Sequence, residues 1–301
     1  MKKYIFIVTL SLLLFNCKNS KQTNGKLNVV TTTTMITDLT KNIGGEHINL
    51  QGLMGSGVDP HLYKASEGDV TKLANADIIF YNGLHLEGKL VEVFEKMKSK
   101  KTIAVADAID KSTLIGSEYF ASNYDPHIWF DIEYWKQATQ FVVQNLSEAI
   151  PEQKEIFEAN GKAYIEKLDV LKTKVESAIA TLSEEQRILV TAHDAFNYFG
   201  KAFNFEVVGL QGLSTATEAG VKDVQKLSTF IIENKVKAIF VESSVPKRTI
   251  EALQAAVKSK DYDVTIGGTL YSDALGDAGT IEGTYIGMFE YNVNTIVEAL
   301  K

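Results

Sequence analysis

The tripeptide Asp-Pro-His occurs twice, as Asp59-Pro60-His61 and Asp125-Pro126-His127, in a chain with only four prolines and five histidines. Proline fixes its own φ angle and pushes the preceding residue toward an extended conformation. A histidine that directly follows a proline therefore leaves the backbone in a restricted direction. Because histidine is the commonest metal ligand among side chains, the repeat indicates that His61 and His127 bind a metal. The alternative is two unrelated loop turns that share three residues.

Two more candidate ligands follow predicted strands in the second half of the chain. His193 comes after a predicted strand over 187–191 and before a predicted helix over 195–203, and Asp273 lies beyond a predicted strand over 264–267. In open α/β sheets, ligands bind outside the carboxyl ends of the strands. Three imidazoles and one carboxylate therefore predict a site for one divalent transition metal ion, such as Zn²⁺ or Mn²⁺.

Other side chains compete for these roles. We expect His47 to be solvated in a turn, and His85 to lie near the site rather than in it. Glu242 and Asp107 also follow predicted strands, so each is a candidate to support a ligand or to replace one. His193 taken alone fits a helix cap or a surface position better than a metal ligand, and spacing alone leaves the choice open.

The elements that must position these residues alternate along the chain. Predicted strands cover 27–32, 48–53, 77–81, 102–105, 187–191, 205–209, 238–242 and 264–267. Predicted helices between them include 67–74, 89–98, 134–149, 221–233 and 282–300. This alternation predicts an α/β fold with mostly parallel sheets flanked by helices.

One stretch near the middle of the chain departs from this alternation. After Pro151, which suits a first helical position, apolar residues recur at helical spacing as far as Ile179. We expect one long helix over 151–182 that connects an N-terminal lobe over 27–150 to a C-terminal lobe over 183–301. The alternative is two helices with a break near 181–184.

The first residues have the pattern of a secretory signal. Two lysines precede a short apolar run over 5–15, and the run is followed by Cys17, the single cysteine of the chain. We expect a lipoprotein-type signal peptide over 1–17 with lipidation at Cys17, although Asn16 departs from the small residue usual before such a cysteine. A polar tether over 18–26 would follow. The alternative is a plain signal peptide, or an uncleaved anchor, with an incidental cysteine.

The composition and the absence of certain motifs exclude several classes of function. A formal net charge of −7 without a basic patch argues against a nucleic-acid partner. One cysteine cannot form an internal disulfide framework, and the sequence contains no complete phosphate-binding loop, in which Gly-x-x-x-x-Gly-Lys is followed by Ser or Thr. We expect a monomer outside the cytoplasm, attached to a bacterial membrane only through its lipid.

Several segments together resemble the metal-binding solute-binding proteins of bacterial ABC importers, the solute-binding protein 9 family. These segments run along nearly the whole mature chain and cover 57–63, 76–87, 125–131, 191–199 and 267–276. The resemblance implies two α/β lobes joined by one long helix, with a metal in the cleft between them. It implies metal ligands at His61, His127, His193 and Asp273. The implied partners are an ABC permease and its separate ATPase.

The resemblance also bears on which metal binds. Family members with glutamate at the third ligand position typically bind manganese, but this position is His193 here. Dedicated zinc members often carry a long His-rich loop in the first lobe, whereas residues 107–124 contain no histidine. Zn²⁺ and Mn²⁺ therefore both remain candidates, with Fe²⁺ less favoured, and the affinity order places Zn²⁺ above Mn²⁺.

These observations favour metal capture and delivery over catalysis. The alternative is a secreted zinc-dependent hydrolase that uses the same histidines, with Glu242 as general base. Four protein ligands would close such a site to water, and the sequence lacks a His-Glu-x-x-His signature. A third interpretation, surface adhesion, has no supporting feature in the sequence. Asp59 and Asp125 are interpreted as loop residues or as groups that support a ligand.

Overall fold

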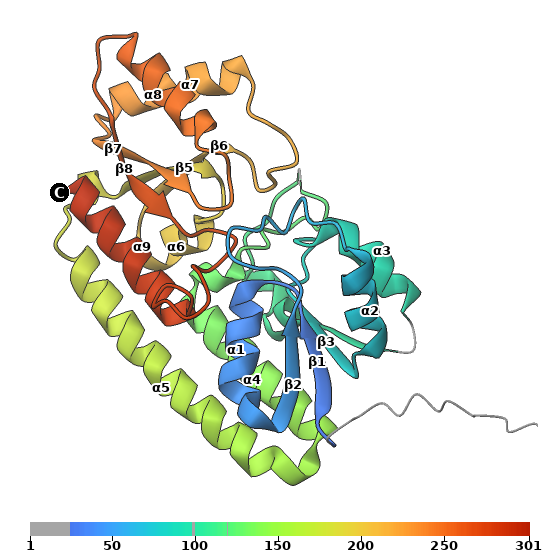
Figure 1. Ribbon diagram of the computed structural model, residues 1–301. Helices are drawn as coiled ribbons and strands as arrows, with labels where there is room; N and C mark the ends of the chain where they lie inside the picture. Colours follow the sequence, from blue (N-terminus) through green and yellow to red (C-terminus); the bar gives the residue numbers. More distant parts are fainter. Residues whose placement is uncertain (1–24, 98–99, 119) are drawn as a thin grey trace, which may run out of the picture.

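The computed structural model describes residues 25–97, 100–118 and 120–301. The predicted signal peptide with Cys17, and the tether as far as residue 24, lie outside the described residues. Figure 1 shows two lobes, each built around a sheet, with one long helix running along the side of both. The predicted α/β fold with two lobes and a connecting helix is therefore confirmed.

The two sheets share the same strand order and are parallel throughout. In the first lobe the order is β2-β1-β3-β4, and in the second it is β6-β5-β7-β8. The first sheet comprises β1 (Leu27–Thr31), β2 (Ile48–Gly52), β3 (Ile78–Tyr81) and β4 (Lys101–Ala104). The second comprises β5 (Ile188–His193), β6 (Glu206–Gln211), β7 (Ala238–Glu242) and β8 (Thr265–Leu270).

Helices cover the faces of both sheets. Those of the first lobe are α1 (Thr34–Gly44), α2 (Glu67–Asn75), α3 (Gly88–Lys96) and α4 (Ile132–Ala149). Those of the second are α6 (Asn197–Phe203), α7 (Val221–Glu233), α8 (Arg248–Lys258) and α9 (Tyr285–Leu300). Because each crossover returns the chain to the same end of the sheet, the carboxyl ends of the four strands in each sheet lie along one edge.

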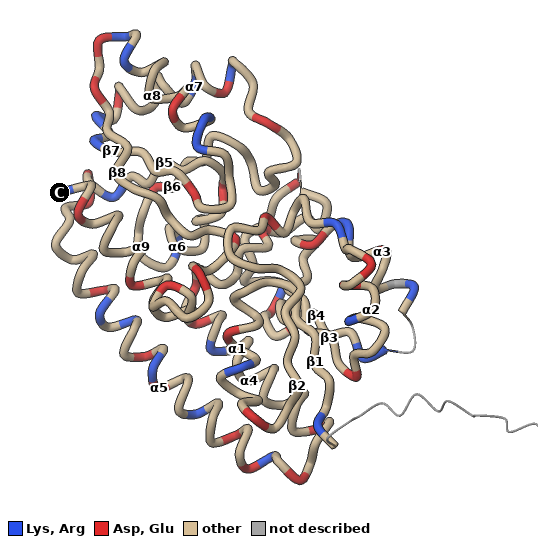
Figure 2. Tube along the Cα trace, viewed as in Figure 1, with Lys and Arg blue, Asp and Glu red and all other residues tan. Residues whose placement is uncertain are grey.

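The connecting helix α5 (Lys154–Ile179) has 26 residues, which corresponds to a length of about 39 Å. It is preceded by a short 3₁₀ turn that begins at Pro151. Acidic and basic residues alternate along its exposed side (Figure 2), while its apolar stripe is buried. Gly161 lies on this stripe, where a Cβ atom would come within 2.4 Å of the Val143 side chain. The glycine therefore allows α5 to pack closely against α4.

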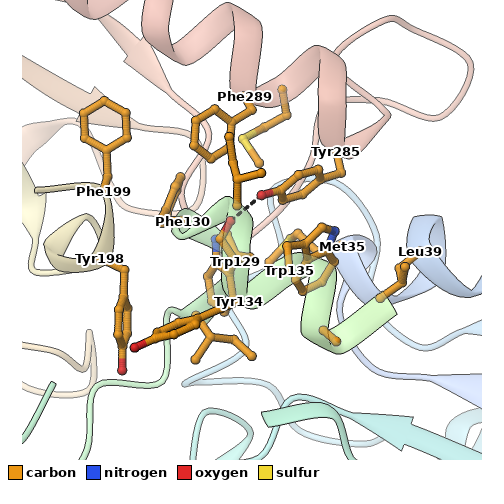
Figure 3. Close-up of a cluster of buried hydrophobic side chains, with 14 of the residues drawn as sticks. Met35, Leu39, Trp129, Phe130, Tyr134, Trp135, Tyr198, Phe199, Tyr285 and Phe289 are labelled. Carbon is orange, nitrogen blue, oxygen red and sulfur yellow. Dashed lines mark hydrogen bonds between the residues drawn. The ribbon is translucent and has the colours of Figure 1, made fainter. Parts of the chain in front are cut away.

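A continuous hydrophobic cluster extends from one lobe into the other (Figure 3). It includes Met35 and Trp135 in the first lobe and Phe289 in the second. The ring of Trp135 stacks on Tyr285 at a centroid distance of 4.9 Å, and the Tyr285 hydroxyl donates to the Trp129 carbonyl at 2.7 Å. Beside α5 and α9, the two lobes therefore share one core and are not free to separate there.

Two element boundaries differ from those predicted near the site. Strand β5 continues to His193, which pairs with Gln211 of β6, so His193 ends the strand rather than following it. Helix α6 begins at Asn197 instead of residue 195. The ladder extends because the His193 backbone N–H also donates to the Glu242 carboxylate at 2.8 Å. Among the described residues, no helix combines the length and apolar character needed to cross a membrane.

Candidate metal site

Four side chains from separate loops and strand ends meet between the lobes. His61 lies in the loop after β2, His127 lies between β4 and α4, His193 ends β5, and Asp273 follows β8. One ligand atom of each residue lies within 4.8 Å of the others, and all four residues are buried. The structure thus brings together the four residues predicted from the sequence.

The distances between the four side chains suit a small cation. The Nε2 atoms of His61 and His127 are 3.3 Å apart, and His193 Nε2 is 3.3 Å from Asp273 Oδ2. His127 Nε2 lies 3.6 Å from Asp273 Oδ1, and His61 Nε2 lies 4.0 Å from Asp273 Oδ2. Tetrahedral coordination with bonds of about 2.0–2.1 Å places ligand atoms about 3.3 Å apart. The four atoms therefore approach the spacing of one tetrahedral metal.

One orphaned oxygen also fits a bound cation. Asp273 Oδ1 is buried and, within the part of the chain that the structure describes, has no hydrogen-bond partner. A buried polar atom without a partner is costly to the fold. A cation among the four side chains would satisfy this oxygen, and the three imidazoles would supply nitrogen donors.

The charges within the cluster are unequal. Burial lowers the pKa of His61 to about 3, so its ring is neutral at physiological pH. Burial opposes charge on His193 as well, but the carboxylates of Glu242 and Asp273 raise its pKa well above the usual value. Burial would also raise the pKa of Asp273, yet the neighbouring His193 makes the net shift downward. Because metals bind neutral imidazoles, an incoming cation would displace the proton of His193.

Glu242 supports a histidine and does not line the centre of the cluster. Its Oε2 atom lies 2.6 Å from His193 Nδ1, and its Oε1 atom accepts the His193 backbone N–H. This pairing leaves Nε2 of His193 directed at Asp273. Of the three roles open to Glu242 from the sequence, the geometry selects the support of a histidine. As a general base it would need to reach a bound water, and it faces the opposite nitrogen of the ring.

The two Asp-Pro-His turns repeat one local arrangement. Oδ1 of Asp59 accepts the backbone N–H of His61 at 2.8 Å, and Oδ1 of Asp125 accepts that of His127 at 2.9 Å. Asp125 Oδ1 also lies 2.7 Å from Nδ1 of His127, which leaves Nε2 of that ring for the cluster. In each turn, the aspartate before the proline thus accepts a hydrogen bond from the backbone of the histidine after it.

The other competing residues lie outside the cluster. His85 is exposed, and the ring of Phe120 lies 6.3 Å from it and 6.5 Å from His61. His47 is half-buried with its ring edge against Phe157, and Asp107 is exposed. The prediction that His85 lies near the site but not in it agrees with this placement.

Sequence reasoning missed a buried network beneath His127. The Asn82 side chain donates to the Pro126 carbonyl at 2.9 Å. Glu87 is 1% exposed, and its Oε1 atom accepts from the Asn82 backbone N–H at 2.7 Å and the Thr32 hydroxyl at 2.6 Å. Its sequence signal was the segment after a strand in which Leu84 and Leu86 precede Glu87.

Comparisons with known proteins point to one family. The sequence model described as "ZnuA: Zinc-uptake complex component A periplasmic" matches residues 29–299. The chain is 49% identical to the manganese-binding lipoprotein MntA of Bacillus subtilis (strain 168) over 93% of its length and 92% of that protein. It is also 49% identical to the zinc-binding protein TroA of Treponema pallidum (strain Nichols), over 92% of its length and 90% of TroA. A solved structure of the periplasmic zinc-binding TroA superposes with a TM-score of 0.89, covering 92% of this chain and 99% of the other.

Proposed function

The chain belongs to the family of zinc-uptake complex component A, and from this premise we propose that it captures a divalent transition metal ion outside the cytoplasm and delivers it to an ABC-type permease. The family resemblance inferred from the sequence is confirmed by the match over residues 29–299. Members of this family are substrate-binding proteins of importers and not enzymes. The comparisons therefore give no support to the hydrolase alternative.

The metal ion is the cargo of this protein, and we propose His61, His127, His193 and Asp273 as its ligands. The observation that carries the proposal is that four buried ligand atoms from two lobes lie within 4.8 Å of one another. A site formed from both lobes can be opened by a movement of either side. Four protein ligands would leave no coordination position for a reactive water, which suits transport.

The donor set makes Zn²⁺ and Mn²⁺ the candidate cargoes. Related proteins are named for manganese binding in one case and for zinc binding in another. Three imidazole nitrogens favour Zn²⁺ when both ions are available, because affinity for divalent ions rises from Mn²⁺ toward Zn²⁺. Fe²⁺ remains the lesser candidate.

We further propose how the protein is organised at the membrane. A signal over 1–17 would end at lipidated Cys17, followed by a tether over 18–26, so that a monomer is held by its lipid. The mature chain would then consist of lobes over 27–150 and 183–301 joined by a helix over 151–182. Two relatives described as lipoproteins support the anchor. Mass spectrometry of the N-terminal peptide from the membrane fraction tests it.

The decisive experiment removes single ligands. His61→Ala and His127→Ala should each lower the affinity for Zn²⁺ by more than the 10–100-fold that loss of an outer supporting group costs. The affinity is measured by competition with a chelator of known strength, and circular dichroism checks that the lobes stay folded. His85→Ala is the matched control, because this exposed histidine lies close to the site, and it should bind as the unchanged chain does. Unchanged affinity in His61→Ala would refute the ligand set.

A further inference from the structure

Each Asp-Pro-His turn reaches across to the other lobe through its aspartate. The Thr215 hydroxyl, in the loop between β6 and α7, donates to Asp59 Oδ2 at 2.5 Å. The Asn197 side chain, at the start of α6, donates to Asp125 Oδ2 at 3.0 Å. Within each carboxylate, one oxygen therefore holds the histidine of its own turn and the other oxygen accepts from the second lobe.

We propose that Thr215 and Asn197 are positioning residues that tie the two first-lobe histidines to the second lobe and thereby set the rate at which the metal leaves. This inference rests on the proposed metal site. A first-lobe histidine cannot withdraw from His193 and Asp273 unless its turn separates from the second lobe. The hydrogen bond between the aspartate of the turn and the second lobe must break for that separation to occur.

The shared core shows why local bonds control release. Beside α5 and α9 the lobes are joined by buried aromatic side chains, including the stacked Trp135 and Tyr285. Opening by separation of the whole lobes would expose that core to water. Movement of a single turn breaks only the few hydrogen bonds that hold it, and the Asp59 turn lies in a loop that includes exposed residues such as Leu62.

The two bridges differ in strength. Asp59 is joined to the second lobe through the Thr215 hydroxyl, and the Ser56 hydroxyl, three residues earlier in the same loop, donates to Asp277 in an exposed contact. Asp125 accepts from Asn197, and its backbone carbonyl also accepts the Tyr198 hydroxyl at 3.0 Å. Loss of Thr215 should therefore free its turn more than loss of Asn197 frees the other. The His61 turn is the side from which we expect the metal to leave.

The test measures Zn²⁺ release from the full-length chain into an excess of a fluorescent chelator by stopped flow. Thr215→Val keeps the shape of the side chain but removes the donor, and it should speed release by about five- to tenfold. Thr215→Ser retains a hydroxyl and should restore a rate near that of the unchanged chain. Thr217→Val is the matched control, because Thr217 is an exposed threonine of the same loop, and it should have no effect.

Asn197→Ala should speed release less than Thr215→Val, because Tyr198 still joins Asp125 to the second lobe. The association rate and the thermal stability of the metal-free chain should change little in Thr215→Val. Release at the unchanged rate in Thr215→Val, or equally fast release in Thr215→Ser, would overturn the inference while the metal site stands. If the chain without any substitution retained no Zn²⁺, both proposals would be overturned.

Discussion

The two Asp-Pro-His turns have the same sequence and the same internal hydrogen bond, but they are held in different ways. The His127 turn is buried on all sides, and its ring is oriented by Asp125 while Asn82 holds the preceding carbonyl. Asp59 contacts the backbone of His61, and the turn is followed by the exposed Leu62. The same three residues thus form one fully buried turn, which we expect to be rigid, and one turn beside exposed residues, which we expect to move.

Different supports underlie this contrast. Beneath the His127 turn, Glu87 holds a segment in which Gly83, Leu84 and His85 all adopt left-handed φ angles, of 86°, 50° and 63°. Beyond the His61 turn, the Tyr63 hydroxyl donates to Asp69 at 2.7 Å, next to the N-terminus of α2. The support from Glu87 is internal, and the segment that it holds has strained backbone angles. The hydrogen bond between Tyr63 and Asp69 lies nearer the surface.

The largest expected effect follows from removing the internal support. Glu87→Ala should lower the free energy of unfolding of the metal-free protein by about 3 kcal/mol, because three buried donors, the Thr32 hydroxyl and the backbone N–H groups of Asn82 and Gly83, lose their acceptor at about 1–3 kcal/mol each. Urea denaturation followed by circular dichroism measures the change. Glu67→Ala, at an exposed glutamate, is the control and should cost less than about 0.5 kcal/mol. Equal losses would mean that Glu87 does not support this turn.

The next effect separates the two aspartates. Asp125→Asn should lower Zn²⁺ affinity by about 10–100-fold, since a neutral amide is a weaker acceptor for the Nδ1–H group of His127. Asp59→Asn should lower it less, because Asp59 contacts the backbone of His61 and Thr215. Competition titrations at one pH provide both affinities. Similar losses in the two variants would remove the distinction between a rigid and a movable turn.

The smallest effect concerns the hydrogen bond between Tyr63 and Asp69, and it depends on pH. Burial would raise the pKa of Asp69, but hydrogen bonds from Ser66, Tyr63 and Lys72 lower it to about 2. The folded-state pKa thus lies below the unfolded value of about 3.8, so Asp69 stabilises the fold above pH 4 and loses this contribution as pH falls through 2. Asp69→Asn should cost about 1 kcal/mol at pH 7.

Unfolding of the metal-free chain and of this variant is compared between pH 7 and pH 2. The difference in unfolding free energy should shrink toward the acid end of this range. Asp263→Asn, at an exposed aspartate of the second lobe, should show no such trend. A difference that stays constant with pH would show that the charge of Asp69 has no part in supporting the segment after His61.

Much of the fold was predictable because its signals are local. Strand β7 and helix α7 agree with the predicted ranges at both ends, since an apolar run and a helical period depend only on nearby residues. The end of β5 was predicted two residues too early. Its last pairs depend on Gln211 in β6 and on the carboxylate of Glu242, which lie far away in the sequence.

The sequence by itself determined the residue types of the site and their placement at strand ends, because proline geometry and α/β alternation are encoded in short segments. Which nitrogen of the His193 ring faces the cluster was decided only by the tertiary structure, through Glu242, which lies 49 residues away. The same holds for the partners of the two aspartates. Thr215 and Asn197 are 156 and 72 residues away from the carboxylates they contact. No local pattern reports such a pair, since it forms only when two lobes with a common core pack together.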